Sequence, residues 1–227
     1  AFNGDIQAFS TFFVQINLAW QHIKQAGYPI GGSLAFSRSI EKRYLALGGK
    51  IDYRSPVAKI LVENERAVGV RLADGTEHRS DIVISAADGH TTIFDMLDAK
   101  YIDDKIRGYY EKWPLYSPLI YVALGVSRSF AGLPHHITYL LEKPINIDNK
   151  EQKNIYVNIY SYDPTLAPAG KTVIIAMLTA EYDYWKKLRE GNLVKYKEAK
   201  EKIADQVIDF LESRFPGLRA QMEMRDV

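Results

Sequence analysis

Two short segments carry residue types that would let a ligand come close to the backbone. Gly31 and Gly32 follow Tyr28 and Pro29 and stand directly before a helical pattern, where a glycine pair permits either close approach of a ligand or a tight start of the helix. Asp88 follows an apolar run. A carboxylate at the end of a buried strand needs a partner, which either a ligand or the N-terminus of the next helix can supply. Both segments are candidate sites with a structural alternative.

Catalytic side chains of the common kinds are not evident in the sequence. His135 and His136 are neighbours whose side chains diverge in a strand, and no HxxxH or HExxH pattern accompanies them, which argues against a metal site. GxSxG, P-loop and EF-hand patterns are absent. Glu181 and Asp183 lie in a segment typical of a helix start and form no catalytic pair. The sequence therefore identifies no catalytic residue, which is compatible with an enzyme whose cofactor does the chemistry.

The composition excludes several classes of function. The 227 residues are 47% hydrophobic, enough for a sizeable core, and a net charge of +1 provides no field for binding nucleic acid. The chain has no cysteine, which excludes disulfides and thiolate chemistry. No apolar run approaches the roughly 20 residues that cross a bilayer and no signal peptide pattern opens the sequence, so we expect a cytoplasmic protein. Its 15 tyrosines are compatible with an apolar ligand tunnel or with ordinary packing.

The stretch from Gly31 to Asp88 is predicted to place the candidates on a helix and a small sheet. Apolar residues at helical spacing predict a helix that Gly48 and Gly49 end, and Pro56 makes a bend. Strands are predicted at residues 50–53, 57–62, 67–72 and 81–85. The last of them, DIVIS, is apolar on both faces, as in a parallel strand of a covered sheet.

The rest of the chain has the pattern of a sheet covered by helices. Helices are predicted at residues 9–24, 89–97, 102–113 and 193–214, and strands at residues 119–126, 136–141, 154–160 and 172–180. Residues 142–153 are charged and are predicted as a surface hairpin. Antiparallel strands with helices on one side make an α+β domain, here with an α/β-like first part.

The order of these motifs resembles one protein family. The segments GYPIGGS, LGGKI, PVAKI, GVRLADG and DIVISAAD follow the order of the middle of FAD-dependent phytoene desaturases and carotenoid isomerases, within the wider amine-oxidase-like flavoproteins. The run from Asp163 to Lys171 is similar to that family's Asp-Pro-Ser/Thr segment with a following Pro-x-Gly. The resemblance extends from Gly27 to Gly217.

The resemblance implies positions for the cofactor and the substrate. Pro56 and Val57 would lie at the adenine of FAD, with the backbone of Val57 as its hydrogen-bonding partner, where a plain strand residue is the alternative. The small residues at the end of DIVIS and the acid that follows them would let the dinucleotide pass close to the strand end, or would merely ease the turn into the next helix. These residues are Ser85, Ala86, Ala87 and Asp88. The loop with Tyr28, Gly31 and Gly32 would border flavin and substrate.

The resemblance also predicts the domain organisation. Residues 27–98 would be part of an FAD-binding domain, residues 1–26 and 99–217 a substrate-binding domain, and residues 218–227 the return to the FAD-binding domain. The GxGxxG turn, which sets a helix N-terminus against the FAD pyrophosphate, occurs nowhere in the sequence, and neither does the family's C-terminal glycine-rich flavin segment. We therefore expect an internal fragment of a larger enzyme, which binds FAD weakly or not at all by itself.

Three functions are compatible with these observations. The first is an FAD-dependent oxidoreductase acting on a long apolar polyene, a carotenoid precursor or retinoid, which hydride transfer to or from flavin would desaturate, saturate or isomerise. The second is an amine or protoporphyrinogen oxidase of the same superfamily, which charged or aromatic-cage groups in the tunnel would favour. The third is a flavin-free binding module.

The expected partner is an apolar small molecule rather than a nucleic acid. The predicted helix at residues 9–24 corresponds to a region that borders the substrate entrance in the family and can touch a membrane surface, although a stripe of this kind also fits core packing. The sequence does not indicate the oligomeric state.

Overall fold

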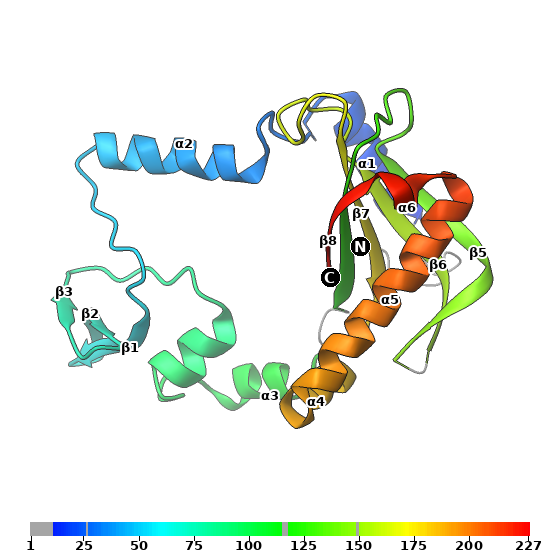
Figure 1. Cartoon of the computed structure of the whole chain (residues 1–227). Coiled ribbons are helices and arrows are strands. Elements are labelled where there is room, and N and C mark those ends of the chain that lie inside the picture. Colours follow the sequence, from blue (N-terminus) through cyan, green and yellow to red (C-terminus); the bar gives the residue numbers. More distant parts are fainter. Residues whose placement is uncertain (1–10, 26, 115–117, 149) are drawn as a thin grey trace. The chain divides into compact units, whose positions relative to one another are not determined.

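The computed structural model describes residues 11–25, 27–114, 118–148 and 150–227. The chain divides into two compact units, one formed by Ala1–Glu41 with Tyr116–Val227 and the other by Lys42–Leu115. Figure 1 shows the elements of both.

A five-stranded antiparallel sheet is the centre of the first unit. Its strands stand in the order β5-β6-β7-β4-β8. They are β4 (Leu119–Val126), β5 (His136–Ile147), β6 (Lys150–Ile159), β7 (Thr172–Thr179) and β8 (Met222–Asp226). Buried residues alternate with half-buried or exposed ones along β4, β6 and β7, because successive side chains of a strand point to opposite faces.

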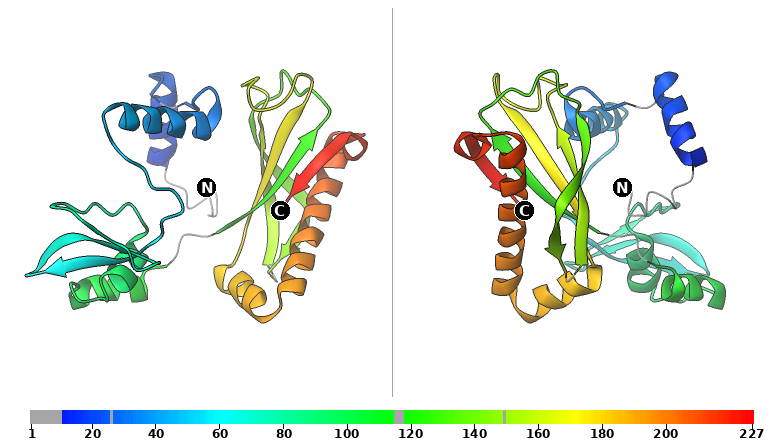
Figure 2. Two further views of the ribbon diagram at one scale, coloured as in Figure 1. Left: turned by 60° about the vertical axis from the view of Figure 1, so that its left-hand side comes forward. Right: turned by 90° about the vertical axis from the view of Figure 1, so that its right-hand side faces the viewer.

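One face of the sheet is buried under the long helix α5 (Leu193–Arg214), as both views of Figure 2 show. The helix contributes Ile203, Ala204, Val207, Ile208 and Leu211 to the core. The sheet meets them with Val122, Leu124, Val126, Ile155, Val157, Ile159, Ile174, Ala176 and Leu178. Each fully buried Leu or Ile side chain in such a layer contributes about 1.5 to 3 kcal/mol, so this contact holds the unit together.

The described residues of the first unit include four further helices. They are α1 (Thr11–His22), α2 (Gly32–Ala46), which runs into the second unit, α4 (Tyr182–Gly191) and α6 (Leu218–Gln221). The large apolar side chains of α1 and α2, such as Phe12, Leu18 and Phe36, are exposed. None of the described helices is long and apolar enough to cross a membrane.

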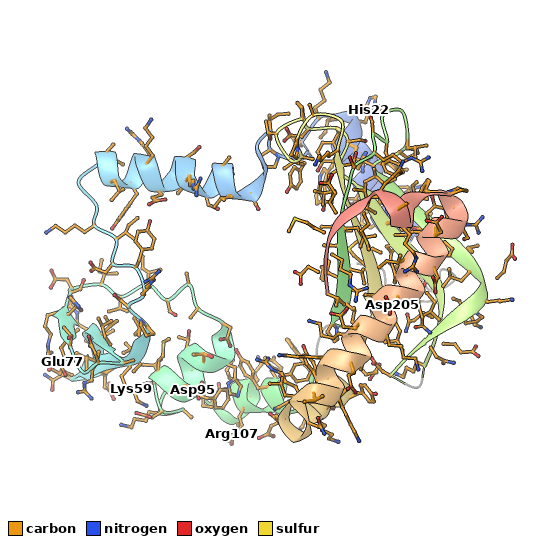
Figure 3. The ribbon with its side chains drawn as sticks, in the orientation of Figure 1. His22, Lys59, Glu77, Asp95, Arg107 and Asp205 are labelled. Atoms are coloured by element: carbon orange, nitrogen blue, oxygen red, sulfur yellow. The ribbon has the colours of Figure 1, made fainter. Side chains whose placement is uncertain are left out.

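The second unit is a small sheet with two helices. β1 (Val57–Glu63), β2 (Arg66–Leu72) and β3 (Glu77–Arg79) form an antiparallel meander, followed by the π-helix η2 (Thr91–Met96) and by α3 (Asp104–Lys112). Lys59 of β1 donates a hydrogen bond of 2.7 Å to the backbone oxygen of Asp95 and forms an ion pair with Asp98. Lys59 and Asp95 are labelled in Figure 3. These contacts attach η2 to the meander.

The α+β class is confirmed, and so is the predicted helix at residues 193–214. The predicted strands within residues 57–72 correspond to β1 and β2, and those from residue 119 onward correspond to β4, β5, β6 and β7. The antiparallel pairing of β5 with β6 agrees with the hairpin predicted at residues 142–153, but the hairpin is not wholly on the surface, because Ile145 and Ile147 belong to the core. Strand β8 was not predicted, because its sequence MEMRD is polar and it is held at the sheet edge by pairing with β4.

Two predicted strands are wrong. Residues 50–52 have no regular secondary structure, and a turn begins at Tyr53. Residues 81–85 are not a strand either, and Ile82 and Ile84 are 72% and 88% exposed. The ladder of the meander ends with the bond from Ser80 N–H to Val68 O, and no described backbone group pairs with residues 82–86. A strand needs such a partner, whatever the hydrophobicity of its side chains.

Candidate functional site

The face of the large sheet that α5 does not cover is here named the open face. Its side chains form two rows that cross β4, β7, β6 and β5, as the strand register shows. The first row is Tyr121, Met177, Tyr156 and Thr138, and the second is Ala123, Ile175, Asn158 and His136. All are half-buried or exposed, in contrast to the fully buried residues on the other face.

The open face is chemically suited to a flat apolar ligand. The first row offers two tyrosine rings beside a polarisable thioether, and the second offers aliphatic groups. The two polar side chains of the second row, Asn158 and His136, are hydrogen-bonded to each other, with 2.6 Å between Nδ1 of His136 and Oδ1 of Asn158. Neither row contains Asp, Glu, Lys or Arg, but Asp226 of β8 pairs with Ala123 and adds one carboxylate to the same face at the edge of the sheet.

A cluster of aromatic rings lies beyond the end of β6, where Tyr160 continues the alternation of Tyr156 and Asn158 along the open face. The ring of Tyr28 lies edge-on to the rings of Tyr160 and Tyr162, with centroids 6.3 and 5.7 Å away. Tyr160 and Tyr162 are themselves 5.9 Å apart. Burial raises the pKa of Tyr160 and Tyr162, so both remain neutral phenols at physiological pH.

The buried carboxylate of Asp163 joins two loops beside this cluster. Its Oδ2 accepts a hydrogen bond of 2.7 Å from the backbone N–H of Gly31, 132 residues away. Its Oδ1 accepts bonds from the hydroxyl and the backbone N–H of Thr165, at 2.7 and 2.9 Å. These donors, the Thr165 hydroxyl first, hold the pKa of Asp163 below its usual value. The side chain is therefore a charged and fully bonded link, although the residue is only 2% exposed.

The glycine pair at the start of α2 is required by the backbone conformation. Gly31 and Gly32 have φ of +88° and +75°, in the left-handed region. A Cβ at Gly32 would also come within 3.3 Å of Leu166 Cδ2 and 3.6 Å of Tyr28 Oη. The tight start of the helix is thus a sufficient reason for both glycines, and their approach to a ligand stays a prediction.

The predicted cofactor residues all lie in the second unit. Pro56 precedes β1 and its carbonyl accepts a bond of 2.9 Å from Ala73 N–H, while Val57 is half-buried and pairs with Leu72. Residues 85–88 are exposed. The carboxylate Oδ1 of Asp88 accepts a bond of 3.0 Å from Thr91 N–H at the start of η2, which is the helix-capping alternative foreseen from the sequence.

A cleft of about 730 Å³ lies where α4 and α5 meet the ends of β4 and β8, and it shares Tyr121 with the first row of the open face. Its walls include Tyr121, Trp185 and Tyr196, but also the ionic side chains of Lys186 and Asp226. The volume suits a small ligand. The ionic groups make the cleft less suitable for a hydrocarbon than the open face.

The aromatic cluster was not predicted from the sequence, and Asp163 was predicted only as part of a segment that resembles the family. One signal was available, since Tyr156, Asn158 and Tyr160 alternate with apolar residues and therefore share a face. An Asp two residues before a Thr also indicates a side-chain-capped turn. Nothing local in the sequence indicates that Asp163 meets Gly31. No group of His, Asp and Glu suited to a metal ion occurs among the described residues.

Comparison with known proteins gives consistent matches. Residues 1–215 match the family described as flavin containing amine oxidoreductase. The chloroplastic prolycopene isomerase of Daucus carota is 28% identical over 214 residues, which cover 91% of this chain and 34% of that protein. The lycopene-forming phytoene desaturase of Pseudescherichia vulneris is 27% identical over 206 residues, covering 86% and 40%. The chain thus spans between a third and two fifths of these relatives.

A solved structure shares the fold. The crystal structure of an oxidoreductase from Methanosarcina mazei matches with a TM-score of 0.60 and 24% identity, covering 87% of this chain and 42% of that one.

Proposed function

The chain belongs to the flavin-containing amine oxidoreductase family, and on this premise we propose that it is part of an FAD-dependent oxidoreductase acting on a long apolar polyene, such as a carotenoid precursor or a retinoid. The open face carries this proposal, because its two rows hold aromatic, aliphatic, hydroxyl, amide and imidazole side chains and no Asp, Glu, Lys or Arg. The names of the prolycopene isomerase and phytoene desaturase relatives support the same substrate class.

The two units have different roles in this proposal. The first unit, as the substrate-binding domain, orients the polyene on the open face and excludes water from it. The second unit helps to hold FAD, which supplies hydride transfer when bound. The described residues contribute binding and orientation.

The residues of the second unit fit one part of an FAD site. Ser85, Ala86 and Ala87 are small and exposed, and no described backbone group pairs with this segment, so its N–H and C=O groups can meet a cofactor. Val57 at the start of β1 would bind the adenine through its backbone. We propose that Ile82 and Ile84 pack within a sheet completed by a segment outside these 227 residues, which would also carry the dinucleotide turn.

The two rows contain no ionic side chain, which favours a polyene over an amine, the substrate of the second candidate class, whereas the carboxylate of Asp226 beside Ala123 at the sheet edge is the feature that would suit an amine. Contact of α1 with a membrane surface remains a proposal as well, supported by its exposed Phe12, Leu18 and Trp20.

A flavin titration followed by absorbance spectra tests this function. It compares this chain with a version extended to the length of its relatives. Bound-flavin bands near roughly 370 and 450 nm are expected only in the extended protein. Absence of flavin from both versions would instead support a flavin-free binding module.

A further inference from the structure

Asp163 divides its hydrogen bonds between two tasks. Oδ1 serves only the local turn, through both donors of Thr165, whereas Oδ2 reaches the distant loop through Gly31. A carboxylate can accept on both oxygens at once, but an amide side chain cannot. The charge and geometry of Asp163 are therefore matched to a link between two loops rather than to the local turn alone.

The same two loops also meet through their aromatic rings. Tyr28 lies three residues before Gly31, directly before a turn closed by a bond of 2.9 Å from Gly32 N–H to Pro29 O. Its ring contacts Tyr160 and Tyr162, which lie three residues and one residue before Asp163. The bond from Gly31 to Asp163 thus fixes the backbone that presents the Tyr28 ring.

The three rings stand at one end of the open face. Tyr160 N–H donates a bond of 2.9 Å to Val173 O at the beginning of β7, so Tyr160 continues the sheet by one residue. The apolar row of Met177 and Tyr121 lies further along the same strands. A long ligand on the open face would meet the rings as an end wall.

We propose that Asp163 is a positioning residue, which through Gly31 holds Tyr28 as the end wall of the open face and thereby determines which bond of a polyene reaches the flavin. This inference rests on the proposed function. Asp163 itself need not touch the substrate. Its effect on the reaction passes through Tyr28.

The test uses product analysis with the full-length, flavin-loaded enzyme. Tyr28→Ala removes the wall, while Tyr28→Phe keeps the ring. Asp163→Asn keeps the shape of the side chain, but an amide has only one acceptor oxygen. With that oxygen on the two Thr165 donors, the amide N–H₂ faces the N–H of Gly31 and the link is lost. Thr165→Val is the matched control, because it removes one local bond and leaves the Gly31 link in place.

We expect Tyr28→Ala and Asp163→Asn to change the ratio of positional products in the same direction, by about tenfold, the scale on which pocket shape discriminates. Tyr28→Phe and Thr165→Val should keep the wild-type ratio. In the double variant, Asp163→Asn should add nothing to Tyr28→Ala, because both act through one ring. Additive effects, or an unchanged ratio in Tyr28→Ala, would overturn the proposal.

Hydrogen exchange of the Gly31 amide provides a readout that does not need turnover. Loss of a hydrogen bond to a carboxylate should speed its exchange by about tenfold or more in Asp163→Asn and much less in Thr165→Val. Equal exchange in the two variants would refute the link. An enzyme that converts no polyene, yet shows the expected exchange, would contradict the proposed function and leave only the link established.

Discussion

The backbone N–H of Gly31 and the carboxylate of Asp163 are 2.7 Å apart, although 132 residues separate them in sequence. This bond makes the stability of the first unit sensitive to acid. A carboxyl group whose pKa is lowered by folding stabilises the folded state above its unfolded pKa, and this contribution is lost as the pH falls through the folded-state pKa.

Asp163→Asn should therefore be less stable than the wild type at neutral pH. The difference in free energy of unfolding should stay constant down to about pH 5 and shrink below about pH 4. Urea unfolding at a series of pH values measures it. A difference that does not change with pH would mean that the charge of Asp163 contributes nothing.

Gly32→Ala should destabilise the protein by about 1 to 2 kcal/mol, the cost of a left-handed conformation for a residue with a Cβ. The contact with Leu166 adds to this cost. Gly27→Ala is the control, because Gly27 has no positive φ and no atom would lie near its Cβ. Thermal unfolding of both variants provides the comparison, and equal melting temperatures would show that the strain at Gly32 is relieved.

Leu211→Ala should cost about 2 to 5 kcal/mol, because the Leu211 side chain is fully buried between α5 and the sheet. Leu193→Ala in the same helix should cost less than about 0.5 kcal/mol, since Leu193 is exposed. Urea unfolding curves measure both. A similar loss in the two variants would contradict the placement of the core on one face of the sheet.

Much of the fold could be predicted because its signals are local. Helix α5 combines a period near 3.6 with a capping Asn192, and its boundaries at Leu193 and Arg214 agree with the prediction. The alternation in β4 and β7 is equally clear. Strand β8 could not be predicted, because Met222–Asp226 is polar and is recognisable only by its pairing with β4.

The wrong predictions concern segments whose structure depends on hydrogen bonds or contacts with residues distant in sequence. The apolar run at residues 81–85 indicates burial, but the hydrogen bonds that would make it a strand are not supplied by the described residues. Likewise, the contact of Tyr28 with Tyr160 could not be predicted, because the whole second unit and three strands of the large sheet separate them in sequence. The assignment of Val57 and residues 85–88 to a cofactor remains a prediction.

Ile84→Ser tests whether Ile84 is a surface residue or becomes buried in the longer protein. In this chain alone the free energy of unfolding should change by less than about 0.5 kcal/mol, because Ile84 is exposed. In the version extended to the length of the relatives we expect a loss of about 2 kcal/mol, as for burial of a large apolar side chain. A small effect in both versions would argue against a completed sheet at residues 81–85.

The central claim is that the open face binds a polyene, and chromatographic analysis of polyene conversion by Met177→Glu tests it most directly. The assay uses the flavin-loaded extended enzyme. The control is Val194→Glu, which makes the same change of charge at an exposed position of α5. A charge beside Tyr121 should raise the KM for the polyene by about tenfold or more, while Val194→Glu should behave as the wild type. Unchanged polyene kinetics in Met177→Glu would contradict the assignment of the open face.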